Sequence, residues 1–191
     1  MVVPEVIGFE IKGKIKEGIT ATDLVLTITE QLRKKGVVGK FVEFYGKGLK
    51  EMSVPDRATI SNMAPEYGAT CGFFPIDQET INFLKVSGRP LDEIKLVEKY
   101  SKAQGLWEDY KKNKRVYSET MELDLSSIEP SLAGPKRPQD KILLSNVADQ
   151  FVSSFEKEFG NDKVENSSSV KNETFEIDHG HVAIAAITSC T

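Results

Sequence analysis

The sequence predicts an α/β protein: a three-layer α/β/α domain followed by a truncated second α/β domain. Three observations favour this class. The segments VIGFEIKGKIKEG and VGKFVEFYGKG alternate apolar with polar residues or run apolar, as strands do. Between them, TATDLVLTITEQLRKKG repeats apolar residues at helical spacing. Strand, helix and strand in this order favour a sheet layer covered by helices.

The first helix lies in TATDLVLTITEQLRKKG. Thr20 or Thr22 can cap its start, because a threonine hydroxyl accepts a hydrogen bond from an unpaired backbone N–H of the first turn. Leu24 and Leu32 belong to one apolar face. Three cationic residues suit the negative end of the helix dipole, and Gly36 then ends the helix.

The rest of the first domain continues the alternation of helix and strand. A helix opens at SVPDRATISNM, where Ser53 or Asp56 is the candidate cap. ATCGFFPID predicts another buried strand. Two helices follow in DQETINFLKVSG and PLDEIKLVEKYSKAQGLW, and the first of them is capped by Asp77 and closed by Gly88.

A change of composition at EDYKKNKRVYSE predicts a boundary between two domains, residues 1–115 and residues 116–191. TMELDLSSIEP opens the second domain as a strand, and NVADQFVSSFEKEFG has helical spacing. The apolar run of residues 182–187 in HVAIAAITSCT predicts a strand buried on both faces. Too few helices lie between these strands to cover both faces of a sheet, so the second domain is interpreted as incomplete.

Composition limits the function classes. The chain has 191 residues, 39% of them hydrophobic, and a formal net charge of −4, which is typical of a soluble globular protein. The net charge argues against a basic nucleic-acid-binding face over the whole chain, although a local basic patch stays compatible with it. No apolar stretch approaches the roughly 18 residues that span a bilayer. We expect no membrane partner.

Asn62 and Glu66 are the first candidate functional pair. They lie four residues apart in ISNMAPEYGATCGFF, a spacing that places both side chains on one face of a helix. An amide and a carboxylate together can hold a hydroxyl, a water or a second carboxylate. Pro65 is expected to end or bend the helix there. The competing interpretation is a solvated helix end with two ordinary polar residues.

Cys190 is the second candidate. A free cysteine is by default a buried structural thiol. Cys190, however, follows a predicted buried strand, and open α/β sheets place their ligand sites at the carboxyl ends of strands. An iron–sulfur ligand needs further thiolates, and Cys71 is the one other cysteine in the sequence. His179 and His181 are interpreted as residues at the entry of the last strand.

Four segments together resemble the aconitase family: TDLVLTITEQLRKKGVVGKFVEFYGKG, SVPDRATISNMAPEYGATCGFFPID, GPKRPQDK and HVAIAAITSCT. The resemblance is to the subgroup of cytosolic aconitase, iron-regulatory protein and bacterial aconitase A. It runs from about Val3 to Thr191, interrupted by divergent helices and the insert KVENSSSVKN. It implies an internal fragment that covers the second domain of the family and part of the third.

The resemblance implies roles for individual residues. Cys190 matches the first of three cysteines that hold a [4Fe–4S] cluster, and the sequence stops just after it. Cys71 lies outside that ligand pattern and is expected to be structural. Glu66 matches the carboxylate that contacts the substrate hydroxyl or the water on the open iron, and Asn62 matches an amide that lies against the cluster.

The implied activity is that of aconitate hydratase, which isomerises citrate to isocitrate through cis-aconitate. The fragment alone is expected to be inactive, because the serine base and most substrate-binding arginines of the family are absent from it. One alternative is an iron-regulatory protein that binds an RNA hairpin through Arg33 and Lys141, although a helix-end cation and a solvated loop residue explain these two equally well. Another is a sister hydro-lyase acting on isopropylmalate or homoaconitate. We expect a monomeric, cytoplasmic parent, with the mitochondrion as the alternative.

Overall fold

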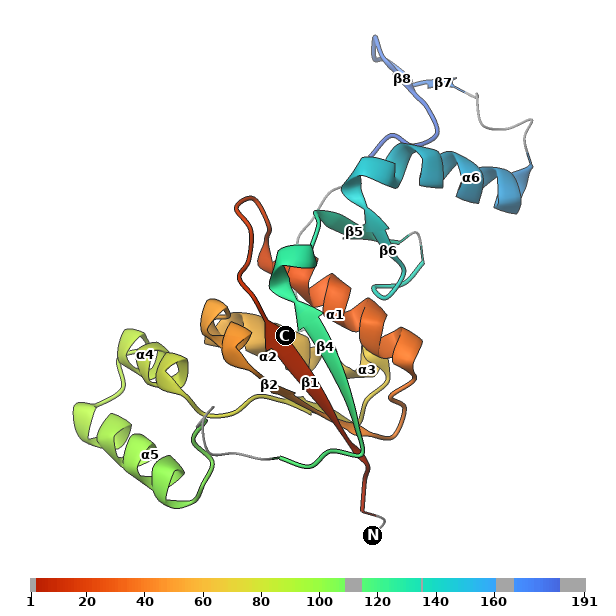
Figure 1. The fold of residues 1–191 in the computed structure, drawn as a ribbon. Coiled ribbons are helices and arrows are strands. Elements are labelled where there is room, and N and C mark those ends of the chain that lie inside the picture. Colours follow the sequence, from red (N-terminus) through yellow and green to blue (C-terminus); the bar gives the residue numbers. More distant parts are fainter. Residues whose placement is uncertain (1–2, 109–114, 135, 161–166, 183–191) are drawn as a thin grey trace. The chain divides into compact units, whose positions relative to one another are not determined.

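The structure is a computed structural model that describes residues 3–108, 115–134, 136–160 and 167–182 (Figure 1). The chain forms two compact units, Met1–Lys141 and Ile142–Thr191. The sequence favours a division after residue 115 instead. None of the described helices is long and apolar enough to cross a membrane.

A parallel sheet of four strands organises the first unit. In spatial order the strands are β3, β2, β1 and β4, and each pairs in parallel with its neighbour. Val6 of β1 lies opposite Phe41 of β2, and Ile7 of β1 lies opposite Glu119 of β4. The bounds are Val6–Lys12 for β1, Phe41–Tyr45 for β2, Cys71–Phe73 for β3 and Glu119–Asp124 for β4.

The strand β4 explains why the observed division differs from the expected one. The charged segment that precedes β4 indicated an exit from the first domain, but Met121 of β4 lies directly opposite Phe9 of β1, inside the same sheet. Leu123 and Leu125 then add to the core of the first unit. Strand pairing between residues more than a hundred positions apart is decided by tertiary contacts, and local composition does not report it.

Helices cover one face of this sheet, which confirms the α/β class. Ile7, Phe9 and Ile11 alternate along β1 and are fully buried against the helices. Figure 1 shows α1, α2 and α3 together behind the strands. Their bounds are Ala21–Lys35, Val54–Asn62 and Ala64–Tyr67.

The caps of these helices confirm the predicted starts. Thr20 caps α1: its Oγ1 accepts from the backbone N–H of Asp23, and the Asp23 carboxylate accepts from the Thr20 N–H at 2.7 Å. Ser53 and Asp56 form the same reciprocal pair at the start of α2. Gly36 ends α1 with φ of 78°, a left-handed conformation that glycine adopts without steric cost.

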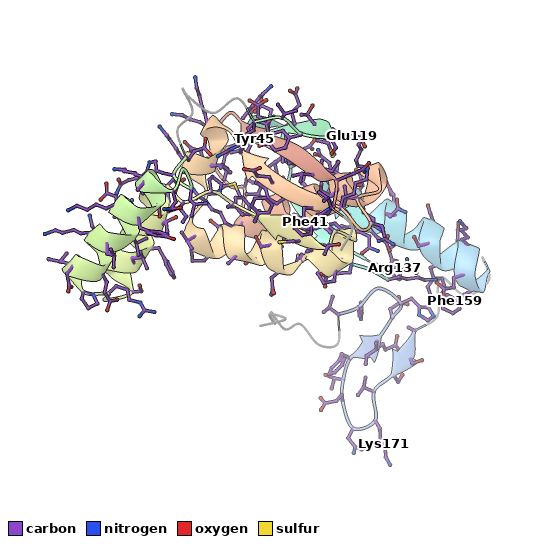
Figure 2. The ribbon with its side chains drawn as sticks, turned by 90° about the horizontal axis from the view of Figure 1, so that it is seen from below. Phe41, Tyr45, Glu119, Arg137, Phe159 and Lys171 are labelled. Carbon is purple, nitrogen blue, oxygen red and sulfur yellow. The ribbon has the colours of Figure 1, made fainter. Side chains whose placement is uncertain are left out.

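The opposite face of the sheet is polar. Glu10 and Lys12 of β1, and Tyr45 of β2, point to this side because side chains alternate along a strand. Figure 2 shows Tyr45 on the side away from α2 and α3. The ring of Tyr117 lies over Gly8, where a Cβ would stand 2.3 Å from a ring carbon. Among the described residues of this unit, no helix crosses this face in Figure 1.

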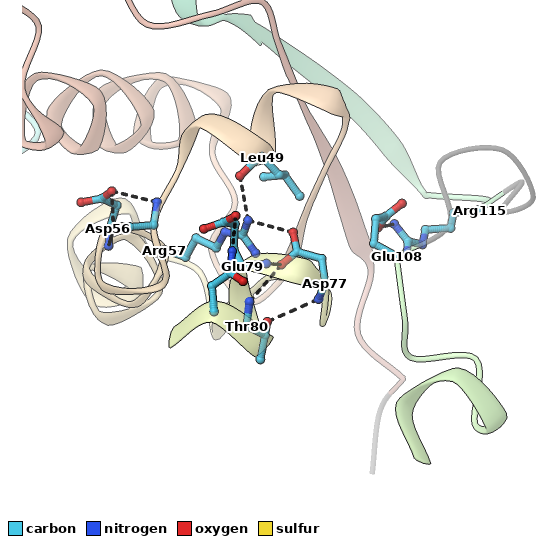
Figure 3. Close-up of polar contacts among 10 residues, drawn as sticks. Leu49, Asp56, Arg57, Asp77, Glu79, Thr80, Glu108 and Arg115 are labelled. Atoms are coloured by element: carbon cyan, nitrogen blue, oxygen red, sulfur yellow. Dashed lines mark hydrogen bonds and ion pairs between the residues drawn. The ribbon is translucent and has the colours of Figure 1, made fainter. Parts of the chain in front are cut away.

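Two further helices, α4 (Gln78–Val86) and α5 (Leu91–Ala103), form a pair beside the sheet. Arg57 of α2 anchors the start of α4. Its Nη2 donates to Asp77 Oδ2 at 2.8 Å and to the Leu49 carbonyl at 2.7 Å (Figure 3). Asp77 also accepts from the first backbone N–H groups of α4, so it is the predicted cap. Leu49 lies in the 3₁₀ turn η1 (Lys47–Glu51).

Short elements complete both units. The turn η2 (Leu125–Ser127) and the strand β5 (Ser131–Ala133) follow β4, and β6 (Lys141–Leu143) spans the division between the units. In the second unit, the turn η3 (Leu144–Asn146) leads into α6 (Val147–Phe159). Two-residue strands, β7 (Ser168–Ser169) and β8 (Glu176–Ile177), pair antiparallel.

The amphipathic helix of the second unit matches its predicted position. Phe151, Phe155 and Phe159 follow one another along α6 with ring contacts, and the Phe155 ring lies 4.5 Å from that of His179. His181 Nδ1 accepts from the Asp178 backbone N–H at 3.2 Å. Of the predicted terminal strand, residues 183–187 lie outside the described part of the chain, and so does Cys190.

Candidate active site

The segment around Asn62 and Glu66 is interrupted between these two residues. The helix α2 ends at Asn62, Met63 links the two helices, and α3 occupies only the next four residues. Pro65 is the second residue of α3, where its missing N–H costs no helical hydrogen bond. The break therefore lies two residues before the proline that was expected to cause it. Asn62 is exposed, and the two side chains do not share one continuous helix.

Glu66 has a buried carboxylate oxygen without a partner. The residue as a whole is half-buried, but its Oε2 is inaccessible to solvent and accepts no hydrogen bond from the described residues. Leaving a buried polar atom unpaired costs about 1–3 kcal/mol. Such an atom is a candidate acceptor for a hydroxyl or a water that the described residues do not supply.

The neighbouring Tyr67 is fully buried, and its hydroxyl is also unpaired among the described residues. Burial, together with the nearby Cys71 and Glu66 groups, raises the pKa of the Tyr67 hydroxyl above its ordinary value. The hydroxyl lies beside Gly72, where a Cβ would stand 2.1 Å away. Sequence reasoning missed this contact, although a glycine inside a strand signals close approach by another group.

Arg33 lies beside the turn that follows Glu66. A Cβ placed at Gly68 would stand 2.9 Å from Arg33 Nη1. Gly68 has φ of 93° and ends α3 in the left-handed conformation, so a side chain there would be strained as well as crowded. The tertiary structure thus brings the cationic end of α1 next to the end of α3, at the edge where β2 and β3 begin.

Further charges line this amino edge of the sheet. Lys40 Nζ lies 2.8 Å from a Glu5 carboxylate oxygen and 3.0 Å from one of Glu119. Lys35 also pairs with Glu119. Hydrogen bonds from Lys35 and Lys40 lower the pKa of Glu119 to about 2. The network carries both signs and is exposed, so it adds little to stability.

The structure corrects the interpretation of Lys141 as a solvated loop residue. Its Nζ donates to Thr27 Oγ1 at 3.2 Å and lies 3.5 Å from Glu30 Oε2, and only 14% of its side chain is exposed. Lys141 is therefore held against α1. Arg33, at the end of the same helix, is exposed.

Cys71 begins β3 near Tyr67, but its side chain alternates onto the sheet face opposite α3. It pairs with Phe41 across β2 and β3, and Gly72 beside it faces Tyr67, so the thiol points to the opposite face. No group of three histidine, cysteine, aspartate or glutamate residues is placed to hold a metal ion in the described parts of the chain. The predicted cluster ligand, Cys190, cannot be located because it lies outside those parts.

Comparison with known proteins shows which family this sequence matches. The sequence model of the aconitase family (aconitate hydratase) matches residues 1–191.

The chain belongs to the aconitase family.

Among its relatives are aconitate hydratases A of several bacteria. The chain is 62% identical over 192 residues to aconitate hydratase A of Legionella pneumophila, covering 100% of the chain and 21% of that protein. Identity is 56% with aconitate hydratase A of Thermus thermophilus and 53% with that of Escherichia coli, with 22% of each protein covered. The chain therefore spans about a fifth of the length of these aconitases, as expected for an internal fragment.

The described residues fit one part of the family's cluster chemistry. Cys71 is their one free thiol, so they supply no set of thiolates for a [4Fe–4S] cluster. The unpaired Oε2 of Glu66, by contrast, is the kind of acceptor that a hydroxyl or water bound to a Lewis-acid iron requires. The described residues thus fit contact with a molecule bound to such a cluster, and not the holding of the cluster itself.

Proposed function

We propose that the complete protein is an aconitate hydratase, which isomerises citrate to isocitrate through cis-aconitate. The observation that carries the proposal is the buried, unpaired Oε2 of Glu66, within a chain that matches the aconitase family from end to end. The bound [4Fe–4S] cluster supplies a Lewis acid for the substrate hydroxyl and carboxylate. Cys190 is proposed as one of its ligands.

Glu66 then has a defined task. Its Oε2 accepts a hydrogen bond from the substrate hydroxyl, or from the water that leaves and returns. No described residue donates a hydrogen bond to this oxygen, so the substrate or water would not have to displace a protein partner. Asn62 is exposed at the end of α2, and we assign it a contact with the cluster side of the same site. The proton-abstracting base is assigned to a part of the protein beyond this chain.

A graft tests the proposal. The corresponding fifth of the L. pneumophila aconitate hydratase A is replaced by this chain, and turnover of citrate and isocitrate is measured. We expect the graft to be active, and the isolated chain to be inactive. A graft that folds and shows cluster absorbance but turns over neither acid would contradict the proposal. Activity on isopropylmalate or homoaconitate instead would favour a sister hydro-lyase.

The cluster assignment has its own variant. Cys190→Ser in the graft is expected to abolish the visible absorbance of the cluster, whereas Cys71→Ser should leave it unchanged. Cys71 is a matched control because it is the other cysteine of the chain and points away from the α3 side of the sheet. A full cluster spectrum in Cys190→Ser would refute the assignment.

An RNA hairpin is the alternative partner that the resemblance implies. Of the two residues involved, Arg33 is exposed, but Lys141 is held by Glu30 and Thr27 of α1. Releasing Lys141 toward a phosphate would break these contacts, so the geometry favours the hydratase over the RNA regulator. A gel shift of the graft with an iron-responsive hairpin, repeated with Arg33→Glu, separates the two.

The cytoplasm is the compartment we propose, and fractionation of cells that express the full protein tests it.

A further inference from the structure

The helix α6 carries an apolar face made of Phe151, Phe155 and Phe159, which is called the phenylalanine face below. The three residues are four positions apart, so their side chains lie on one side of the helix. Neighbouring ring centroids are 5.8 and 4.9 Å apart. Phe151 is 38% exposed and Phe159 is 54% exposed, and no residue of α6 is buried by the described parts of the chain. An amphipathic helix normally turns such a face toward a core.

A tight turn of four residues, Asp178–His181, follows the strand β8. The His181 N–H donates to the Asp178 carbonyl at 3.1 Å, and Gly180 has φ of 92°, which a type II turn requires at its third position. The His179 N–H donates to Asp178 Oδ1 at 2.7 Å, and the Asp178 N–H donates to His181 Nδ1 at 3.2 Å. Three hydrogen bonds within four residues therefore hold the shape of this turn.

The turn lies on the phenylalanine face and contacts it at two points. The His179 ring lies 4.5 Å from the Phe155 ring, measured between centroids. Gly180 lies against Phe151, so that a Cβ on the glycine would stand 3.3 Å from a ring carbon. These contacts fix the place from which the chain continues to Val182. That place is beside the phenylalanine face.

An apolar run comes next in the sequence. Residues 183–187 are Ala, Ile, Ala, Ala and Ile, and they lie outside the described residues. A run of this composition predicts a strand that needs apolar cover. Five extended residues span about 16 Å, and the eight positions from Phe151 to Phe159 span about 12 Å along a helix. The run is therefore long enough to cover the whole phenylalanine face.

We propose that residues 183–187 pack on the phenylalanine face of α6, to which the Asp178–His181 turn leads them. The helix then positions Cys190, three residues further along the chain. The packing is independent of the proposed function, whereas the consequence for Cys190 rests on it, because it takes Cys190 as a cluster ligand.

A second copy of the chain is the competing occupant of the face. The run begins two residues after the last contact of the turn with α6, so its effective concentration at the face is that of a short tether, on the order of millimolar. A second copy has no such tether and loses translational and rotational freedom when it binds. The connection through the turn therefore favours the run of the same chain.

Hydrogen exchange tests the packing, and its outcome does not depend on activity. Exchange of the peptide that contains residues 183–187 is followed by mass spectrometry in the L. pneumophila graft. Phe155→Ala is expected to speed this exchange by about tenfold, and Phe155→Leu, which keeps most of the apolar volume, by less. The peptide of β1, Val6–Lys12, should exchange at an unchanged rate, which shows that the effect is local.

Phe83→Ala is the matched control, because it makes the same substitution at a 42% exposed position of α4. It should leave exchange of residues 183–187 unchanged. Equal exchange of this peptide in Phe155→Ala, Phe155→Leu and the unchanged graft would overturn the proposal. Sedimentation of the isolated chain tests the second copy: a dimer that Phe155→Ala converts to a monomer would also overturn it.

The visible absorbance of the cluster tests the consequence for Cys190. In the graft exposed to air, Phe155→Ala is expected to lose this absorbance severalfold faster than Phe83→Ala. His179→Ala should act like Phe155→Ala, and His179→Phe should restore the slow rate because it keeps a ring against Phe155. If Cys190→Ser abolishes the cluster but Phe155→Ala loses it at the control rate, the positioning role fails and the ligand role stands. A cluster that survives Cys190→Ser contradicts the ligand role instead.

Discussion

The hydroxyl of Tyr67 lies against the backbone of Gly72, so that a Cβ on Gly72 would stand 2.1 Å from the hydroxyl oxygen. Tyr67 is fully buried, and its hydroxyl has no hydrogen-bond partner among the described residues. The next Tyr67 atom, Cζ, would be 3.4 Å from that Cβ. The close contact between α3 and β3 therefore depends on the Tyr67 hydroxyl oxygen on one side and on the absence of a Cβ at Gly72 on the other.

A double-mutant cycle follows from this contact. Gly72→Ala is expected to lower the free energy of unfolding by about 1–3 kcal/mol, because it overpacks the core. Tyr67→Phe removes an unpaired buried hydroxyl and should be neutral or stabilising. In the Tyr67→Phe background, Gly72→Ala should lose most of its cost. Urea unfolding of the four proteins measures the coupling, and additive effects would contradict the geometry.

The buried ion pair of Arg57 and Asp77 predicts a large loss of stability when one partner is removed. Asp77→Ala leaves the guanidinium buried without its carboxylate and removes the cap of α4. We expect a loss of about 3–5 kcal/mol in the free energy of unfolding. Asp56→Ala is the control, because Asp56 closes an exposed capping box and should cost about 1 kcal/mol. Similar losses for the two variants would argue against the buried pair.

Glu119 predicts a pH dependence of stability on the acid side. Hydrogen bonds from Lys35 and Lys40 lower the pKa of its carboxylate from 4.5 to about 2 in the folded protein. Its contribution is thus present above the unfolded value of 4.5 and is lost as the pH falls toward 2. Because the network is exposed and adds little to stability, Glu119→Gln should flatten this part of the stability profile only slightly, as measured by urea midpoints between pH 5 and about 2.5. An unchanged slope would refute the coupling.

Glu66 predicts a specific catalytic defect in the graft. Glu66→Gln keeps the shape of the side chain but weakens the acceptor, and we expect kcat to fall by about 100-fold or more. The visible absorbance of the cluster should persist. Glu79→Gln is the control: it makes the same substitution at the half-buried start of α4 and should leave kcat unchanged. Turnover of Glu66→Gln at the level of Glu79→Gln would remove Glu66 from the site.

Local signals in the sequence predicted the helices well. Thr20, Ser53 and Asp77 each cap the helix that their pattern indicated, because a cap depends on residues within one turn. The helix break was predicted at Pro65 but lies at Met63, since a proline in the first turn of a helix is tolerated. The exact residue at which a helix breaks depends on small differences in free energy between neighbouring conformations.

Non-local relationships were not predictable in the same way. The pairing of β4 with β1 placed the unit division near Lys141, although composition favoured residue 115. Lys141 looked like a loop residue because its partners, Thr27 and Glu30, are more than a hundred positions away. A glycine inside a strand indicates that another group approaches the backbone closely, so Gly8 and Gly72 predicted two close contacts. The sequence did not show that the approaching groups are Tyr117 and Tyr67.

By itself, the sequence determined the α/β class and the helix starts, because these depend on short-range patterns. It also determined the membership of the aconitase family and the candidate role of Glu66, because these depend on long matching segments. The tertiary structure alone decided that Glu66 Oε2 is buried without a partner among the described residues and that Arg33 lies beside Gly68. It alone also decided that Lys12 and Arg115 each contact two carboxylates on the polar face of the sheet. Burial and charge pairing depend on which distant segments meet, and that is decided by packing of the whole unit rather than by any local stretch of chain.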